Sequence, residues 1–305
     1  MREKLGKRPR PACSGHEIVA EVIEVGKDVT TRQVGNIIGV GPLDDSCGHC
    51  HQCSHEKSHL CTDMLMMERQ NNYFRFGGYS TMVQAKAEFT VKIPKDANLK
   101  LIAPLLCAGT TVYTPLKKFV KSGDTVGVMG IGGLGHLAIQ YANKMGCKVI
   151  GFTRSESKVE SIKQLGAHEV IIVDQEMENF KPIIGTINCM INTTPICDPK
   201  TFTNYLMTLA PQGSMVQVGI PLGAPDIPVN FFPLLTNELC VRGSSLGTIK
   251  DTQEAVDFAI ENGVECMVEE FGFMDFPKAF DRMENGKPMF RVVVNVGDYA
   301  KEHGF

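Results

Sequence analysis

The order of apolar and polar positions divides the chain into two patterns. Over the first ninety-five residues, short alternating stretches end at glycine or proline, which is typical of half-buried β-strands joined by turns. These stretches cover Ile18–Val25, Val34–Val40, Asn71–Val83 and Phe89–Pro94. We therefore expect an all-β region here, followed by a linker at residues 96–100.

From Val126 onward, short apolar runs alternate with segments that have helical spacing. The runs predict strands at Val126–Met129, Lys148–Thr153, Val170–Val173, Ile187–Ile191, Met215–Val218 and Leu239–Arg242. The segments between them predict helices at Leu137–Met145, Ser157–Leu165 and Pro199–Leu209. This alternation indicates an α/β fold with a doubly wound parallel sheet of about six strands.

The last part of the chain mixes the two patterns. It predicts helices at Thr252–Glu261 and Phe276–Glu284 and strands at Val264–Val268 and Arg291–Val296. This tail could join either the parallel sheet or the N-terminal β region. The domains expected from these patterns are 1–98, 99–262 and 263–305.

A glycine-rich turn stands between the first of the predicted parallel strands and its helix. It reads Gly130, Ile131, Gly132, Gly133, Leu134, Gly135. In this context the glycines allow a tight turn and a close approach to a pyrophosphate, and the helix N-terminus favours its negative charge. The turn predicts a dinucleotide site, although an ordinary strand-to-helix turn could have the same glycines.

The residues after the second parallel strand indicate which dinucleotide. A carboxylate at this point would bind the ribose 2′-hydroxyl and repel a 2′-phosphate. This chain instead has Thr153, Arg154, Ser155 and Lys158, whose hydroxyls and positive charges favour NADP. Two other interpretations remain: the cations could be solvated charges at a helix start, and a shifted register could bring Glu156 to the ribose.

Four cysteines stand close together in the β region. Cys47, Cys50, Cys53 and Cys61 have two, two and seven residues between them. Four thiolates make a closed tetrahedral zinc site without an open position for water, which predicts a structural zinc. An iron–sulfur cluster is the rival interpretation, and the interspersed His49, His51, His55 and His59 could compete as ligands.

Composition narrows the class of protein. The chain has 305 residues, enough for two domains, and its net charge of −3 gives no indication of a nucleic-acid or membrane partner. No apolar run approaches the length of a membrane-spanning helix, and the basic N-terminus lacks the apolar segment of a secretory signal. Eleven cysteines without such a signal indicate a reducing compartment, so we expect a cytoplasmic protein.

Taken together, the motifs resemble one family. Gly15-His16-Glu17, the four-cysteine lobe, residues 106–113 and the glycine turn occur in the order found in zinc-dependent medium-chain alcohol dehydrogenases. The chain is most similar to the cinnamyl-alcohol-dehydrogenase branch, and the resemblance extends from about Gly15 to Val296. It implies a GroES-like β catalytic domain, a Rossmann NADP-binding domain inserted in it, and a C-terminal return to the catalytic domain.

The resemblance also assigns roles to single residues. His16 and Cys107 match the second and third ligands of a catalytic zinc, and Glu17 matches a nearby acid that can approach the metal. Without the resemblance, Cys107 would be interpreted as a core cysteine, and the pair His16–Glu17 as a solvated turn. The positions that match the lining of the NADP site are Thr111, Thr193, Gly219, Ser244, Ser245 and Leu246. The family also implies a homodimer joined by strands of the nucleotide domain.

The chain departs from the family before His16. Only fifteen residues precede it, and they contain no Cys-His-x-Asp stretch to supply the first zinc ligand; Cys13 is the one upstream cysteine. The β domain is therefore expected to be N-terminally truncated, with exposed apolar edges. Residues 64–76 are candidates for lining a substrate pocket, and core packing would explain them equally well.

Two functional hypotheses follow. In the first, NADPH delivers hydride to an aldehyde carbonyl that is polarised by zinc held by His16, Glu17 and Cys107, with alcohol oxidation as the reverse reaction. In the second, the chain is a catalytically impaired NADP-binding paralogue or fragment that retains only the structural zinc. The first predicts two zinc ions per chain and the second predicts one.

Overall fold

The computed structural model describes residues 13–67, 77–174, 178–195, 198–220, 229–285, 288 and 290–304. Most of the segment expected to line a substrate pocket (68–76) and the start of the strand expected at 71–83 lie outside these ranges. The chain forms two compact units, Met1–Thr110 with Leu246–Phe305, and Thr111–Ser245. Residues 99–110 and 246–262, expected in the nucleotide domain, thus lie in the first unit.

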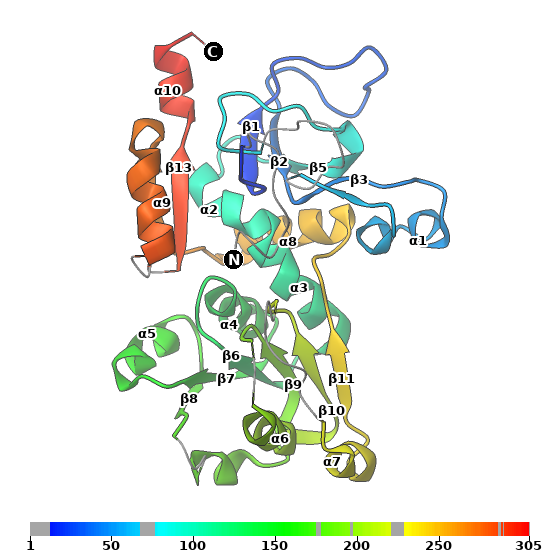
Figure 1. The fold of residues 1–305 in the computed structure, drawn as a ribbon, viewed down its shortest axis with the longest axis vertical. Coiled ribbons are helices and arrows are strands. Elements are labelled where there is room, and N and C mark those ends of the chain that lie inside the picture. Colours follow the sequence, from blue (N-terminus) through cyan, green and yellow to red (C-terminus); the bar gives the residue numbers. More distant parts are fainter. Residues whose placement is uncertain are drawn as a thin grey trace. The chain divides into compact units, whose positions relative to one another are not determined.

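The strands that the structure describes in the first unit form three small sheets (Figure 1). The antiparallel sheet has the order β1-β2-β5, with β1 Ile18–Glu21, β2 Ile37–Val40 and β5 Thr90–Ile93. The hairpin pairs β3 Leu43–Asp45 with β4 Leu65–Met66, and the parallel pair joins β12 Val268–Gly272 to β13 Arg291–Asn295. The C-terminal tail therefore forms its own parallel pair within this unit.

The helices of the first unit are short, apart from α8 and α9. They are α1 His51–Ser54, α2 Leu99–Ile102, α8 Ile249–Asn262, α9 Phe276–Asn285 and α10 Gly297–Glu302, with 3-10 turns at Ser58–Leu60, Ala87–Phe89, Ala103–Leu106 and Phe273–Asp275. Helix α8 begins with a capping box, in which the Thr248 hydroxyl accepts from the Asp251 backbone N–H and the Asp251 carboxylate accepts from the Thr248 N–H. It ends at Gly263, whose φ of 66° is left-handed.

Several sequence-based boundaries in this unit were wrong. The strand expected at Val264–Val268 begins only at Val268, because Val264 and Cys266 are buried without pairing in a ladder. The strand expected at Ile18–Val25 ends at Glu21, and Ile23 beyond it is 63% exposed. The expected linker at 96–100 contains the start of α2. Apolar alternation reports burial, and it does not distinguish a paired strand from a buried loop.

The second unit has the expected parallel doubly wound sheet. Its strands are β6 Thr125–Met129, β7 Lys148–Thr153, β8 Glu169–Ile172, β9 Ile187–Asn192, β10 Leu209–Gln217 and β11 Cys240–Gly243. They lie in the order β11-β10-β9-β6-β7-β8, and each neighbouring pair is parallel (Figure 1). The order reverses between β6 and β9, and ligands of such sheets bind at this switch point, beyond the carboxyl ends of the strands.

The helices of the second unit flank this sheet. They are α4 Gly135–Lys144, α5 Val159–Gln164, α6 Pro199–Met207 and α7 Phe231–Thr236, with 3-10 turns at Glu156–Lys158 and Glu178–Ile183; α3 Ala108–Phe119 starts in the first unit and continues into the second. The core contains an aromatic cluster in which Phe152, Phe180 and Tyr205 contact one another.

In the part of the chain that the structure describes, no single helix is long and apolar enough to cross a membrane. The bent pair Leu99–Leu106 and Ala108–Phe119 meets that criterion only when its two helices are taken together.

Candidate functional site

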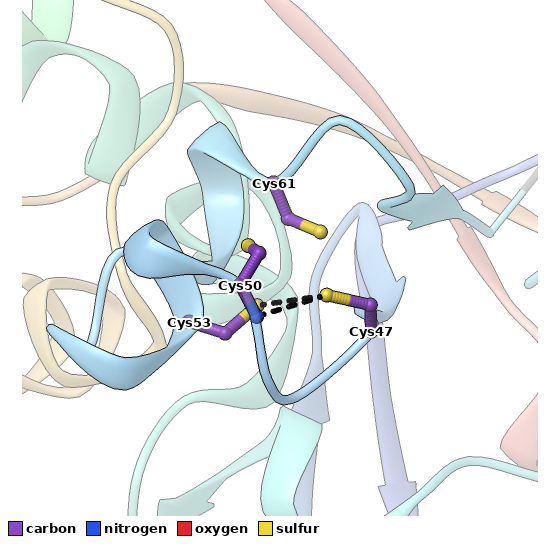
Figure 2. A group of neighbouring side chains, drawn as sticks. All are labelled: Cys47, Cys50, Cys53 and Cys61. Atoms are coloured by element: carbon purple, nitrogen blue, oxygen red, sulfur yellow. Dashed lines mark hydrogen bonds between the residues drawn. The ribbon is translucent and has the colours of Figure 1, made fainter.

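The four cysteines of the predicted metal lobe converge on one point. Cys47, Cys50, Cys53 and Cys61 have Sγ atoms that all lie within 4.8 Å of one another (Figure 2). The Sγ atoms of Cys47 and Cys53 are 3.9 Å apart. A tetrahedral zinc with Zn–S bonds of about 2.3 Å needs S–S separations of about 3.8 Å. The donor set therefore fits a zinc ion.

The surroundings of the four thiols act on their ionisation in opposite directions. The Cys50 N–H donates to the Cys47 sulfur at 3.4 Å. The hydroxyl of Ser46 lowers the pKa of Cys53 to about 7. A hydrogen bond from the Cys47 backbone lowers the pKa of Cys61, but burial and the thiols of Cys47 and Cys53 outweigh it and raise that pKa to about 11. Four sulfur atoms this close repel one another as thiolates, so a bound cation is what would stabilise them together.

The second group of predicted ligands is organised differently. The Glu17 carboxylate accepts from the Ala108 backbone N–H at 3.2 Å, and it lies 3.5 Å from the Arg291 guanidinium. Glu17 thus contacts the residue next to Cys107, at the start of α3, and pairs with the C-terminal strand β13. This arrangement holds Glu17 in a structural ion pair, and Cys107 itself is half-buried rather than a core cysteine.

These residues do not complete a catalytic metal site. Among the described residues, the four cysteines of the lobe are the only group of three or more ligand atoms close enough to share an ion. His16, Glu17 and Cys107 do not form such a group, and Cys13 does not complete one. The Cys13 thiol lies 3.3 Å from the Gly77 carbonyl oxygen and 3.2 Å from that of Tyr79. His16, Glu17 and Cys107 are therefore not gathered into a three-donor group among the described residues, and a catalytic zinc on them stays a prediction.

The glycine turn lies at the switch point of the parallel sheet. Gly130, with a φ of 81°, follows β6, and Thr193 follows β9. A Cβ at Gly130 would collide with the side chains of Thr193 and Thr194, and a Cβ at Gly135 would overlap the Gly130 carbonyl oxygen. Nothing lies within 4 Å of the position that a Cβ on Gly132 would take. The turn is thus tightly packed on the protein side and open where a pyrophosphate would approach.

The other predicted cofactor residues are spread over several elements of the chain. Ile131 is buried, while Gly133 and Leu134 are half-buried before α4. Thr111 is buried in α3, and a Cβ at Gly219 would overlap the Thr193 carbonyl oxygen. The backbone of Ser244 donates to the Gln217 carbonyl at 3.0 Å, and Ser245 is exposed. Leu246, with a φ of 54°, belongs to the first unit.

The segment after β7 presents hydroxyls and cations. The Thr153 hydroxyl accepts from the Ser155 backbone N–H at 3.1 Å, and the Ser155 and Ser157 hydroxyls are 2.7 Å apart. Arg154 and Lys158 are exposed on the same turn. The positive charge of Arg154 is close enough to the phenol of Tyr205 to oppose the rise in its pKa caused by burial. These residues can hold a phosphate group at the end of β7.

Comparisons with known proteins agree with this architecture. The family model of the alcohol dehydrogenase GroES-like domain matches residues 1–95, and that of the zinc-binding dehydrogenases matches residues 133–261. A protein of Mesembryanthemum crystallinum named as a probable mannitol dehydrogenase is 35% identical over 99% of this chain and 84% of its own length. The chain belongs to the zinc-binding alcohol dehydrogenase family.

Solved structures of this dehydrogenase family have the same fold. A cinnamyl alcohol dehydrogenase of Sorghum bicolor matches with a TM-score of 0.86 and 30% identity, over 94% of this chain and 82% of its own. The cinnamyl alcohol dehydrogenase of Helicobacter pylori complexed with NADP(H) matches with a TM-score of 0.83 and 32% identity, over 94% and 83%. The GroES-like and Rossmann folds expected from the sequence are thereby confirmed.

The structure adds residues that the sequence patterns did not indicate. The buried Asn192 side chain donates to Gln217, and its oxygen accepts from the N–H and hydroxyl of Thr194 at 2.9 and 2.8 Å. Gln217 in turn donates to the carbonyls of Thr194 and Gly219 at 2.9 and 2.7 Å. The His136 Nδ1–H donates to the Gly132 carbonyl at 2.9 Å. Asn192 and Gln217 are polar residues at the ends of buried strands, and this position was the signal in the sequence that could have indicated them.

Proposed function

We propose that this dehydrogenase uses NADP(H) and interconverts a small-molecule alcohol and its aldehyde. The glycine turn that Thr193 holds at the switch point of the sheet is the observation that carries the proposal. When bound, NADPH supplies the hydride that reduces the carbonyl carbon. The names of the relatives, and the NADP(H) in the Helicobacter pylori structure, support this chemistry.

The chain's own residues would bind and orient the cofactor. The first turn of α4 offers backbone N–H groups and the positive end of the helix dipole to the pyrophosphate. The open side of Gly132 lets the phosphates approach the backbone. Arg154 and Lys158 would pair with a 2′-phosphate, because they are exposed beside hydroxyls and no carboxylate stands directly at the end of β7.

A second candidate function is an NADP-binding protein that retains only the structural zinc. The ion pair of Glu17 with Arg291 favours it, because this carboxylate is already used in the fold. We derive no metal-dependent step for His16 and Cys107, since the described residues offer them no third ligand. The four-cysteine site does not depend on this choice, and there zinc would stabilise the lobe.

Metal content and turnover together test the proposal. Protein purified without added metal is assayed for zinc per chain, for NADPH binding by fluorescence, and for NADPH oxidation with a panel of aldehydes. Turnover of at least one aldehyde supports the dehydrogenase. One zinc per chain with tight NADPH binding and no turnover would support the second candidate, and absence of NADPH binding would contradict both.

We propose a homodimer joined through the nucleotide-binding unit, where α7 exposes Phe231, Phe232 and Leu235. A cytoplasmic location and the absence of nucleic-acid or membrane partners stay predictions from composition.

A further inference from the structure

Two amide side chains are hydrogen-bonded to each other at the carboxyl end of the parallel sheet. Asn192 is the last residue of β9 and Gln217 the last residue of β10, and they are direct neighbours in the register of these strands. The same row continues to Met129 of β6 and Gly243 of β11. The Asn192 side-chain nitrogen donates to the Gln217 side-chain oxygen. The pair therefore lies where the strands end and the loops of the switch point begin.

Backbone groups fix the orientation of both amides. The Asn192 side-chain oxygen accepts from the backbone N–H and the hydroxyl of Thr194, at 2.9 and 2.8 Å. The Gln217 side-chain nitrogen donates to the carbonyl oxygens of Thr194 and Gly219, at 2.9 and 2.7 Å. A backbone N–H only donates and a carbonyl only accepts, so neither amide can turn by 180° without losing these bonds.

The pair bonds to backbone groups beyond the two strands. Thr194 and Gly219 follow the ends of β9 and β10, and the Asn192 backbone carbonyl also accepts from the Gly219 N–H at 3.1 Å. Gly219 is thus held by both its N–H and its carbonyl, and a Cβ on it would overlap the Thr193 carbonyl oxygen. Asn192 is fully buried, and burying an amide is unfavourable unless it is hydrogen-bonded. The hydrogen bonds of the pair therefore fix the chain segments that follow β9 and β10.

The strand order indicates which half of the cofactor these segments meet. We have placed the pyrophosphate at the turn after β6, and the 2′-phosphate of the adenosine half beside Arg154 and Lys158 after β7. In the order β11-β10-β9-β6-β7-β8, β7 lies on one side of β6, and β9 and β10 lie on the other. A dinucleotide with its adenosine at β7 and its pyrophosphate at β6 extends its nicotinamide half toward β9 and β10.

We propose that Asn192 and Gln217 are positioning residues for the nicotinamide half of the cofactor. They act through the segments Thr193–Thr194 and Gly219, which their side chains hold in place at the switch point. The inference rests on the proposed use of NADP(H), and it names the residues that orient the reactive end of that cofactor.

Calorimetric titration of the full chain with NADP⁺ and with adenosine 2′,5′-bisphosphate tests this role. The second ligand contains the 2′-phosphate and lacks the nicotinamide half. In the double variant N192L/Q217M, apolar side chains of similar shape replace both amides. The Kd for NADP⁺ should rise by about tenfold or more, because several hydrogen bonds are lost together. The Kd for adenosine 2′,5′-bisphosphate should not change, whereas a general loss of structure would raise both values.

The single variant N192D keeps the size of the side chain and adds a readout that depends on pH. Its carboxyl still accepts from Thr194, but the ionised form places an acceptor against the Gln217 oxygen, which cannot turn away. The protonated form donates to that oxygen and restores the bond, and burial raises the pKa of this carboxyl. The ratio of the Kd of N192D to that of wild type should therefore be high at about pH 8 and fall toward one at about pH 5.5.

The wild-type pair gives no such pH response. Among the described residues, its hydrogen-bond partners are backbone groups and the Thr194 hydroxyl, which do not titrate in this range. Taking the ratio to wild type at each pH also removes the titration of the phosphate of NADP⁺ itself.

Asn188 provides the matched control. It lies in the same strand, and its side-chain oxygen accepts from the Thr125 N–H at 2.8 Å, at the amino end of the sheet. N188D should bind both ligands as wild type does at every pH.

The inference is overturned if N192L/Q217M or N192D binds NADP⁺ as wild type does, if adenosine 2′,5′-bisphosphate is weakened as much as NADP⁺, or if the N192D ratio is independent of pH. A wild-type chain that binds neither ligand would overturn the proposed function, and this inference with it.

Discussion

The hydroxyl oxygen of Thr193 lies 2.7 Å from the carbonyl oxygen of Gly130. It is also 2.9 Å from the Met129 carbonyl oxygen, and the Thr193 backbone N–H donates to that same atom at 3.1 Å. These hydrogen bonds connect the end of β9 to the turn that follows β6. These bonds position the turn at the point where the sheet order reverses, so the proposed cofactor site depends on a residue 63 positions along the chain from Gly130.

We expect Thr193→Val to weaken NADPH binding. Removing a hydroxyl that bonds two carbonyls costs about 1 kcal/mol and loosens the turn, which corresponds to roughly a five- to tenfold rise in Kd. Thr193→Ser keeps the hydroxyl and should bind nearly as wild type does. Fluorescence titration measures the affinities. Equal Kd values for wild type, Thr193→Val and Thr193→Ser would show that NADPH binding does not depend on the hydrogen bonds of this hydroxyl.

Two glycines of the turn should respond differently to replacement by alanine. In Gly135→Ala the new methyl group overlaps the Gly130 carbonyl oxygen, so the start of α4 must shift, and we expect a loss of about 1–3 kcal/mol in the free energy of unfolding. In Gly132→Ala the methyl group meets open space, and stability should change by less than about 0.5 kcal/mol while NADPH binding weakens. Urea unfolding and NADPH titration separate the two effects. A Gly135→Ala protein as stable as wild type would contradict the packing described here.

Arg154→Ala should affect the choice of cofactor. A charge-assisted hydrogen bond contributes about 1.5–3 kcal/mol, so the Kd for NADPH should rise by about tenfold or more. Binding of NADH, which lacks the 2′-phosphate, should stay the same. Lys163→Ala, an exposed cation on the neighbouring α5, serves as the control and should change neither value. If Arg154→Ala raises the Kd for NADPH and the Kd for NADH equally, Arg154 does not bind the 2′-phosphate.

The pair of Lys100 and Glu270 should make a small, pH-dependent contribution to stability. Lys100 lies 3.1 Å from the Glu270 carboxylate, and hydrogen bonds from Lys100 and Asn295 lower the pKa of that carboxyl below 4.5. A lowered pKa stabilises the fold above pH 4.5, and this stability disappears as the pH falls through the lowered value.

Lys100→Met should therefore reduce the free energy of unfolding at pH 7 by about 0.5 kcal/mol, a modest value because both side chains are partly exposed. The difference from wild type should shrink below pH 4.5. Denaturant unfolding at a series of pH values measures it, with Lys95→Met as the control for loss of one positive charge. A difference that stays constant with pH would rule out the ion pair as its source.

The exposed apolar residues of α7 should form part of a contact between two copies of the chain. Phe231, Phe232 and Leu235 are 76%, 72% and 80% exposed, and β11 is the edge strand of the same unit. Light scattering should find a dimer, and Leu235→Asp should convert it to monomer by placing a charge in the interface. Met274→Asp, at an equally exposed apolar residue of the first unit, should remain dimeric. A monomeric wild type would contradict the proposal.

The sequence predicted the central strands of the parallel sheet well, because β6 and β9 are largely buried apolar runs. Val126–Met129 and Ile187–Ile191, for example, coincide with β6 and β9 to within one residue. The grouping of the four cysteines was predicted equally well, because they all lie within residues 47–61 of the sequence. The predicted strand boundaries in the first unit were less accurate. Val264 and Cys266, for example, are apolar because they are buried, and they do not pair with another strand.

Local sequence patterns could not predict the long-range polar contacts. The pairing of Glu17 with Arg291 joins positions 274 residues apart, and nothing local to either residue indicates it. The Asn192–Gln217 network depends on the register between two parallel strands. The resemblance to a family supplied a role for Glu17 but none for Arg291, Asn192 or Gln217, and these contacts could be found only in three dimensions.

The division of the chain also has a consequence for its synthesis. The first unit takes residues from both sides of the second, up to Thr110 and from Leu246 onward. A ribosome releases residues 111–245 before β12 and β13 are synthesised, so the second unit can fold while the first unit still lacks its last strands and the Arg291 partner of Glu17. Nascent chains should therefore be competent for NADPH binding before the first unit is complete.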